Sequence, residues 1–403
     1  MTDPAGAADA AAAAALTSWG RLLAILAAPT RDLALAEDAL ADAFEQALVH
    51  WPRDGVPRNP EGWLLTVARN RQIDELRSAR RRTGVPLDDA AERKAEDPEP
   101  DDVPDRLLAL LFVCAHPAID PGVRTPLMLQ TVLHVDARVI ATAFAVPAAA
   151  MAQRLVRAKR RIRDAGIAFE VPDPTRRAER LPYVLEAVYG AYAIGRQGVQ
   201  AGRATDDLRG ESLHLARLLA ELMGDEPEVL GLAALVSLAA ARDDATEAYV
   251  PLDDQDPARW DRDLIARGEA YLRRASGFGQ IGRFQLEAAI QSVHDARALT
   301  GSTDREALLS LYGALVRVAP TLGALVGHAL AVAQVEGPEA GLLLLDEVPG
   351  DRFQPAWAAR AALLAQAGRA DEARPAFDRA IELTEDPAVR EHLRQRRDGA
   401  RGT

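Results

Sequence analysis

The spacing of apolar residues predicts an all-α protein. Between residues 16 and 82, apolar positions recur at three- and four-residue intervals with acidic residues on the opposite face, and strand patterns are absent. The clearest run consists of Leu35, Ala39, Leu40, Ala43, Phe44, Ala47 and Leu48. The turn-like segment HWPRDGVPRNP, residues 50–60, predicts the end of this helix, and another begins at Glu61. Residues 16–82 therefore form the first predicted helical domain.

A predicted linker follows at residues 83–105. It combines one glycine and four prolines with nine acidic residues, a composition that buries too little apolar surface to fold alone. Helical spacing resumes at Arg106, and Pro147 separates RVIATAFAV from AAAMAQRLVRAKRRIRDAG. Two helices joined by a tight turn, the second of them basic, indicate a helix-turn-helix domain at residues 106–168.

The remaining chain, residues 169–403, has the pattern of helices of about 10 to 15 residues separated by Gly, Pro and Asp turns. Near its end, small and large apolar residues occur at the spacing of a tetratricopeptide (TPR) unit. These residues are Trp357, Ala361, Leu364, Gly368, Ala373, Phe377 and Ala380. A weaker unit lies at residues 325–348. We therefore predict a C-terminal α-helical, TPR-like repeat domain.

Length and composition limit the class of protein. A chain of 403 residues with 48% hydrophobic residues is expected to form two or three domains. No uncharged stretch approaches the roughly 20 residues of a membrane span. Residues 1–15 lack the pattern of a secretory signal, so we expect a disordered tail and a cytoplasmic protein without membrane partners. The one cysteine excludes a disulfide framework.

Charge is distributed unevenly along the chain. The net charge is −12, but residues 1–165 carry +5 once the linker is set aside, and residues 166–403 carry −10. A basic front half is compatible with nucleic-acid binding despite the acidic total.

Two basic helices contain the candidate binding residues. The first candidates, in the second helix of the first domain, are Arg69, Asn70, Arg71, Arg77, Arg80 and Arg81. Most of them share one helical side, where arginines suit phosphates and the amide suits a base edge. A solvated arginine face is the alternative. The second candidates follow the predicted helix-turn-helix, which favours DNA binding there: Gln153, Arg154, Arg157, Lys159, Arg160 and Arg161.

The motifs resemble a known family. LAEDALADAFEQALVHW and NPEGWLLTVARNRQIDELRSARRR resemble region 2 of extracytoplasmic-function (ECF) sigma factors of the sigma-70 family, and AHPAID through VPAAAMAQRLVRAKRRIRDAGI resembles their region 4. Downstream, LHLARLLAELMGDEPEVLGLAALV and LDDQDPARWDRDLIARG resemble the subgroup with a TPR-like C-terminal extension. The resemblance covers nearly the whole chain from residue 16.

The resemblance implies roles for these residues. It implies that core RNA polymerase is bound through its beta-prime clamp helices and beta flap, with clamp contacts from Glu37, Asp38, Asp42 and Phe44. The first basic helix would bind the minus-ten element, with Asn70 on the exposed strand, and the second would bind the minus-thirty-five element. Trp63 would assist melting or pack in the core. Ala152 stands where many such factors have arginine.

The predicted linker is long enough for both elements. Its 23 residues extend to about 75 Å at about 3.3 Å per residue. That length corresponds to about 22 base pairs at about 3.4 Å each. By resemblance such linkers thread through polymerase channels, whereas composition alone is equally compatible with an ordinary spacer. The subgroup's Phe-Asn-Glu-Gly-Tyr stretch is replaced here by Tyr189-Gly190-Ala191-Tyr192.

Enzymatic and metal-site motifs are absent from the sequence, so we expect no catalytic residue and no cofactor. Cys114 and His116 lack the further ligands that zinc requires, which favours core packing. The leading hypothesis is an alternative sigma factor regulated by its own repeat domain, which also binds a peptide or protein. The alternatives are a polymerase-independent helix-turn-helix regulator and a repeat-based interaction scaffold.

Overall fold

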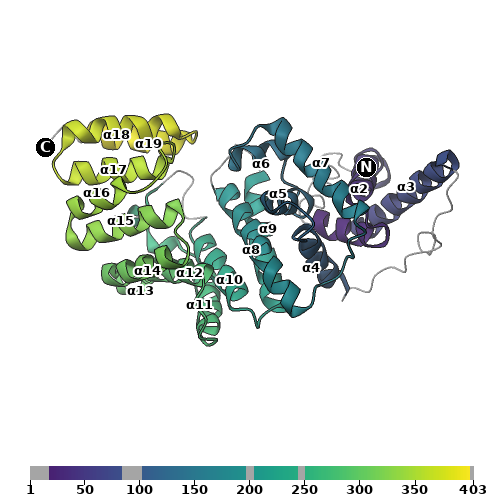
Figure 1. Cartoon of the computed structure of the whole chain (residues 1–403), viewed down its shortest axis with the longest axis horizontal. Helices are drawn as coiled ribbons and strands as arrows, with labels where there is room; N and C mark the ends of the chain where they lie inside the picture. The colour runs from purple at the N-terminus through teal and green to yellow at the C-terminus, as the bar shows by residue number, and fades with distance from the viewer. Residues whose placement is uncertain (1–17, 84–101, 197–203, 244–249, 400–403) are drawn as a thin grey trace. The chain divides into compact units, whose positions relative to one another are not determined.

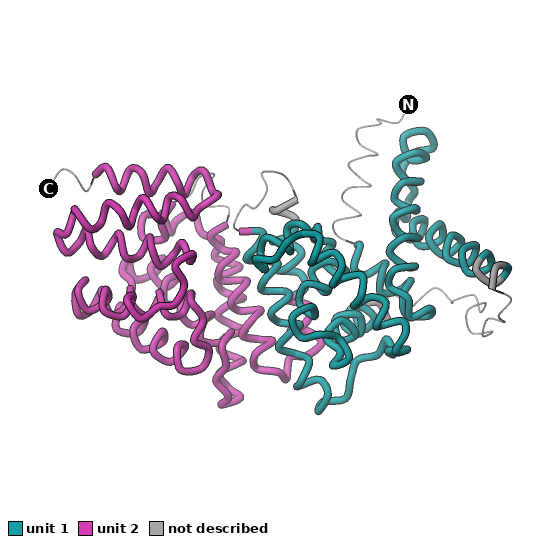
Figure 2. The backbone as a smooth tube through the Cα atoms, turned by 45° about the horizontal axis from the view of Figure 1, so that its top comes forward, with its two compact units in different colours: residues 1–195, 202–215 teal, residues 196–201, 216–403 magenta. Residues whose placement is uncertain are grey.

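Helices form every regular element in the part of the chain that the structure describes. This computed structural model describes residues 18–83, 102–196, 204–243 and 250–399 (Figure 1). No strand occurs within these ranges, so the predicted all-α class is confirmed. The predicted tail and residues 84–101 of the predicted linker lie outside them. Two compact units are formed, by residues 1–195 with 202–215 and by residues 196–201 with 216–403 (Figure 2).

The first unit begins with three helices that we name the first module, residues 18–83. They are helix 18–30, α2 (Leu33–Asp54) and α3 (Pro60–Thr83). Asp32 caps α2, because its carboxylate accepts hydrogen bonds from the backbone N–H groups of Ala34 and Leu35. The core side of α2 consists of Leu33, Ala36, Ala39, Leu40, Ala43, Ala47 and Trp51.

α2 ends later than the sequence predicts. It includes Pro52 and ends at Asp54, inside the segment expected to be a turn. Trp51 is 1% exposed and packs edge-on against Trp63, with ring centres 5.6 Å apart. Burial of a large aromatic side chain contributes about 2 to 3 kcal/mol, which offsets much of the roughly 3 kcal/mol cost of a proline inside a helix.

Four helices form the second module, residues 102–167. They are α4 (Asp102–Cys114), α5 (Pro121–Thr131), α6 (Ala137–Ala143) and α7 (Ala148–Asp164). The first of these begins within the predicted linker. The chain turns by 112° between α6 and α7, an angle typical of helix-turn-helix units. The buried stripe of α7 consists of Met151, Leu155, Ala158 and Ile162.

The first unit also contains α8 (Pro174–Arg196) up to residue 195 and the start of α9 (Ala204–Leu222). The guanidinium of buried Arg124, on α5, lies 4.5 Å from the ring centre of Tyr183 on α8. The same guanidinium donates to the carbonyl oxygen of Ile119 at 3.0 Å. At 23 and 19 residues, both helices exceed the 10 to 15 residues expected from the sequence. Pro182 lies inside α8 without ending it, and the buried residues of this helix run from Leu181 to Gly195.

The second unit is a succession of packed helices. Its elements are α10 (Pro227–Ala240), two short 3₁₀ turns (Leu252–Asp254 and Pro257–Arg259), α11 (Arg262–Ser276), α12 (Arg283–Asp295), α13 (Arg297–Thr300), α14 (Arg305–Val318), α15 (Leu322–Glu336), α16 (Pro338–Asp346), α17 (Gln354–Gln366), α18 (Ala370–Leu383) and α19 (Pro387–Gly399). Glu228 fastens α10 to α12 by accepting from the backbone N–H groups of Phe284 at 3.0 Å and Gln285 at 3.2 Å. Gly231 permits this approach, since a Cβ there would lie 2.7 Å from the backbone nitrogen of Gln285.

The predicted repeat positions meet between α17 and α18. Five of the seven are buried in one apolar cluster: Ala361, Leu364, Ala373, Phe377 and Ala380. Gly368 occupies the turn with a φ of 75°, where a side chain is strained. The arrangement supports the TPR-like assignment, which stays a prediction.

In the described ranges, no single helix combines the length and apolarity needed to cross a membrane. One bent pair, α6 with α7, meets that test jointly by length and composition.

Candidate nucleic-acid interface

α3 presents most of its predicted binding residues to solvent. The exposed ones are Asn70, Arg71, Arg77 and Arg81. Arg69 is half-buried, and the side chain of Arg80 lies outside the described residues. Arg81 Nε donates to the carbonyl oxygen of Arg77 at 3.4 Å, so these two residues lie one turn apart on one side of the helix. The basic side predicted from the sequence is therefore present on α3.

An ion pair joins this face to the acidic helix before it. Arg71 Nε donates to Asp42 Oδ2 at 2.5 Å, and this contact raises the pKa of Arg71 above its usual value. The side chains are 54% and 43% exposed, so both reach solvent. The pair brings a residue predicted to bind DNA beside one predicted to bind polymerase.

The other predicted polymerase-binding residues of α2 differ in exposure. Asp38 is exposed, whereas Phe44 is half-buried and stacks on Trp19 with ring centres 5.9 Å apart. Glu37 is largely buried, and this burial raises the pKa of its carboxyl against the opposing effect of nearby Lys159. Trp63, half-buried against Trp51, is partly a packing residue.

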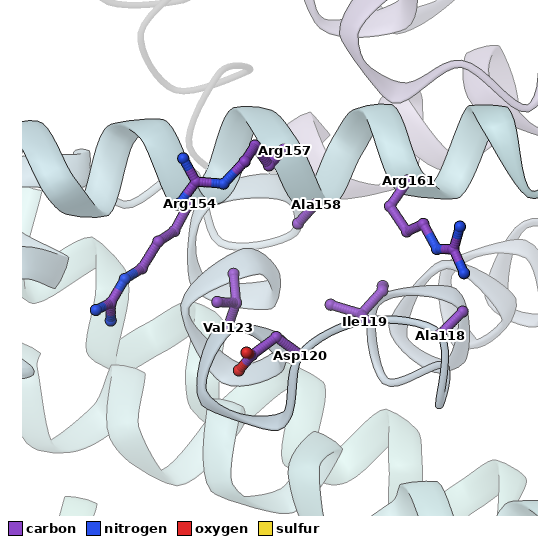
Figure 3. Close-up of a pocket in the computed structure, with 8 residues that line it drawn as sticks. All are labelled: Ala118, Ile119, Asp120, Val123, Arg154, Arg157, Ala158 and Arg161. Atoms are coloured by element: carbon purple, nitrogen blue, oxygen red, sulfur yellow. The ribbon is translucent and has the colours of Figure 1, made fainter.

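The basic face of α7 borders a cavity. Gln153, Arg154, Arg157, Arg160 and Arg161 are exposed. Three of these arginines line a cavity of about 410 Å³ between α7 and the turn that leads into α5 (Figure 3). Arg154 and Arg161 flank it from the helix. Asp120, on the facing turn, uses its carboxylate to cap α5 by accepting from the N–H of Gly122 at 2.8 Å. The cavity is thus predominantly cationic and suits an anionic group.

Lys159 lies apart from that exposed face. Its Nζ is 2.5 Å from Glu37 Oε2, and the two side chains are only 11% and 18% exposed. The second module therefore packs against the first through two residues that the sequence assigns to different partners. In this arrangement both side chains are mostly withdrawn from solvent.

Further contacts between the modules were not predicted from the sequence. Arg163 Nη1 lies 3.6 Å from Asp32 Oδ2, and Arg31 Nη1 donates to the carbonyl oxygen of Gly166 at 3.1 Å. The rings of Trp19 and His134 lie 3.9 Å apart at their centres. One signal in the sequence indicates that Lys159 is less exposed than its neighbours. It follows Ala158 and lies one turn after Leu155, and both of these residues belong to the buried stripe of α7.

Cys114 is a core residue. Its thiol is buried beside the hydroxyl of Thr131, with Sγ and Oγ1 3.4 Å apart, and burial raises its pKa to about 12. His116 Nδ1 accepts a hydrogen bond from the backbone N–H of Ala118 at 3.1 Å. Among the described residues, no group of three or more His, Cys, Asp or Glu side chains is arranged to hold a metal ion.

Two protein families match segments of this chain, and one relative matches nearly all of it. Residues 18–82 match the model of sigma-70 region 2, and residues 180–276 match a family of unknown function, DUF6596. An uncharacterized protein of Rhizobium meliloti (strain 1021) is 39% identical over 383 residues, which cover 91% of this chain and 90% of that protein. No solved structure matches. The region 2 match coincides with helix 18–30, α2 and nearly all of α3.

Proposed function

We propose that this chain, which belongs to the sigma-70 family, is an alternative sigma factor of the ECF type that directs core RNA polymerase to a limited set of promoters. Its role in transcription initiation, with core polymerase and promoter DNA as partners, follows from the region 2 domain at residues 18–82. One observation carries the finer proposal: within that domain, α3 exposes Asn70, Arg77 and Arg81 together.

In this proposal α3 binds the minus-ten element. Asn70 contacts a base of the opened strand, and the arginines contact phosphates. Glu37, Asp38, Asp42 and Phe44 of α2 bind the polymerase clamp helices. Since sigma factors act by binding, no catalytic residue is required.

The second module would act as region 4. Support comes from the 112° turn between α6 and α7 and from the exposed basic face of α7. Gln153, Arg154 and Arg157 are assigned to the groove of the minus-thirty-five element, and Lys159, Arg160 and Arg161 to its phosphates.

Residues 169–403 are proposed to regulate the factor and to bind a peptide or protein. Residues 166–403 carry a net charge of −10, opposite in sign to the DNA-binding modules. Paired helices with small residues at their seam, as in α17 and α18, are typical of repeat domains that bind other proteins.

A promoter transcription assay tests the proposal. DNA that co-purifies with the native holoenzyme supplies the template, and the double substitution Arg69→Ala with Asn70→Ala is expected to abolish promoter opening. Arg267→Ala, on an exposed arginine of α11, serves as the control and should transcribe normally. Duplex binding without any association with core polymerase would instead favour a polymerase-independent regulator, and a silent double variant would favour an interaction scaffold.

A further inference from the structure

The cavity between α7 and the turn that leads into α5 combines positive charge with an apolar wall (Figure 3). Three of its lining residues recur at three- and four-residue spacing and so lie along one side of α7: Arg154, Arg157 and Arg161. The apolar wall consists of Ala158 on the same helix and of Ile119 and Val123 opposite, all of them buried. The volume of about 410 Å³ lies within the range of about 300 to 1,000 Å³ that small-molecule sites occupy. The cavity therefore has the size and the lining of a site for an organic anion.

The guanidinium groups of these three arginines are available to a ligand. Within the described ranges, none of the three forms an ion pair, whereas Lys159 and Arg163 on the same helix are paired with carboxylates. Asp120, the carboxylate in the lining, accepts instead from the N–H of Gly122 at 2.8 Å. Because each arginine has five N–H donors and no acceptor, the cavity offers more donors than the protein itself uses.

Hydrogen bonds hold the wall opposite α7 in place. Arg124, which is 5% exposed, donates from Nε to the carbonyl oxygen of Ile119 at 3.0 Å and from Nη2 to that of Pro117 at 3.4 Å. The backbone N–H of Ala118 donates to His116 Nδ1 at 3.1 Å. Since these bonds fix the turn before any ligand arrives, binding requires little further ordering of this wall.

Further positive charge surrounds the same turn. Burial lowers the pKa of His116, and nearby cations lower it further against the opposing effect of Glu179: Arg180, Arg124 and Arg161. The last of these lines the cavity, so the other two act in the same neighbourhood. Burial and the positive charges of Arg176 and Arg124 also lower the pKa of Arg180. A concentration of positive charge around a recess with low-dielectric walls attracts anions.

The spacing of the arginines selects an extended ligand. Arg154 and Arg161 are seven residues apart, which is about 10.5 Å along a helix at about 1.5 Å per residue. In Figure 3 their side chains extend toward opposite ends of the cavity. Since ion pairs form within about 4 Å, one phosphate group does not contact both in this arrangement. A chain of linked phosphates attached to an aromatic base can contact the arginines and also cover the apolar wall.

We propose that this cavity binds a free nucleoside triphosphate, with the phosphate chain on the arginines and the base against Ile119 and Val123. Promoter DNA offers the same phosphate chemistry, but the bases of a duplex are stacked on one another and do not reach a recess of this kind. The bound nucleotide competes with the minus-thirty-five element for the arginines of α7. This competition rests on the proposed function, whereas nucleotide binding itself does not.

Fluorescence anisotropy of ATP labelled on its ribose measures binding to the full-length chain without DNA or polymerase. Unlabelled ATP should displace the label at concentrations at least about tenfold lower than either tripolyphosphate or adenosine, because each of these lacks one half of the ligand. Tripolyphosphate as effective as ATP would overturn the proposal, since the apolar wall would then contribute nothing.

Four variants locate the binding. Arg154→Ala and Arg161→Ala should each weaken ATP binding about tenfold through the loss of a charge-assisted hydrogen bond. Ala118→Leu narrows the cavity without a change of charge or of the backbone bond to His116, and should weaken ATP binding to a similar extent. Arg160→Ala is the matched control for nucleotide affinity, because it removes the same charge from the same helix at a residue outside the cavity lining. Its affinity for ATP should stay within about twofold of the wild type.

Wild-type affinity for ATP in both arginine variants would overturn the site. An equal loss in Arg160→Ala would also overturn it, because the binding would then follow net charge alone. Competition is a separate measurement: at constant ionic strength, ATP should release a labelled random-sequence duplex from the wild type and much less from Ala118→Leu. Retention of the duplex at saturating ATP would overturn the competition.

These outcomes are separable from failure of the proposed function. A chain that never initiates transcription, yet binds ATP and loses it in the arginine variants, retains the nucleotide site. A chain that initiates normally but does not bind ATP loses this inference alone.

Discussion

Arg71 Nε donates to Asp42 Oδ2 at 2.5 Å and so ties α3 to α2 inside the first module. Ion pairs as exposed as this one contribute only about 0.2 to 1 kcal/mol, so partners of either residue displace it readily. The pair lies where the basic face of α3 adjoins the acidic face of α2. The proposed DNA and polymerase faces are therefore neighbours on one small helical body.

Arg77→Ala is expected to weaken the holoenzyme–promoter complex in a salt-dependent way. Loss of one phosphate contact should reduce the slope of log Kobs against log salt by about 0.7 to 0.9. Anisotropy titrations at several salt concentrations measure that slope. Arg267→Ala should leave it unchanged, and an equal change in both variants would contradict a phosphate contact at Arg77.

His294 and Asp295 should give opposing pH dependences of stability. Burial lowers the pKa of His294 from 6.5 to about 4, and burial also raises the pKa of Asp295 from 3.8 to about 6, against the effect of its partner Arg242. His294 makes stability increase as pH rises from about 4 to 6.5, because the unfolded chain binds more protons there. Asp295 makes stability decrease as pH rises from about 3.8 to 6, because the folded chain binds more protons there.

Single variants should separate the contribution of His294 from that of Asp295. Relative to the wild type, His294→Asn should make the urea midpoint of the second unit fall more from pH 4 to 6.5, and Asp295→Asn should make it rise more. Between pH 4 and 6.5, the change in the free energy of unfolding of each variant is expected to differ from that of the wild type by on the order of 2 kcal/mol. Parallel curves for the wild type and both variants would argue against the shifted pKa values.

Gly231→Ala should destabilise the second unit by about 1 to 3 kcal/mol. Its new Cβ would lie 2.7 Å from the backbone nitrogen of Gln285, so α10 and α12 must separate and weaken the hydrogen bonds to Glu228. Gly313→Ala is the matched control, since its Cβ would meet nothing closer than 3.8 Å and alanine favours a helix by about 1 kcal/mol. Thermal unfolding should therefore move in opposite directions for the two variants.

Cys114 should resist alkylation in the folded chain. Its thiol is buried, its pKa is raised to about 12, and the thiolate is the reactive form. We expect iodoacetamide at pH 8 to modify it slowly, and rapidly once urea unfolds the chain. Mass spectrometry follows the modification, and equal rates in both conditions would contradict the burial.

Local pattern was sufficient to predict much of this fold. The stripe of Met151, Leu155, Ala158 and Ile162 determines both the helix and which side remains basic, because period and burial are properties of the segment itself. The end of α2 was misjudged because burial of Trp51 is a tertiary effect that local turn signals do not include.

The contact between modules was beyond local reasoning. Lys159 and Arg160 are adjacent cations, yet one is withdrawn against Glu37 and the other is exposed. The partner lies 122 residues away along the chain, and no spacing rule links positions so distant. The sequence thus predicts that the candidate residues lie on a basic helix. Which of them are exposed and which are paired depends on the three-dimensional arrangement.

The contact between the Tyr183 ring and the Arg124 guanidinium has a practical consequence for engineering. The segment matching the family of unknown function starts at residue 180, so its opening helix is built into the same compact body as the second module. An exchange of residues 180–276 between homologues would also replace Tyr183, the aromatic side chain that packs on the second module. Chimeras should instead retain α8 with the DNA-binding half and be joined beyond it.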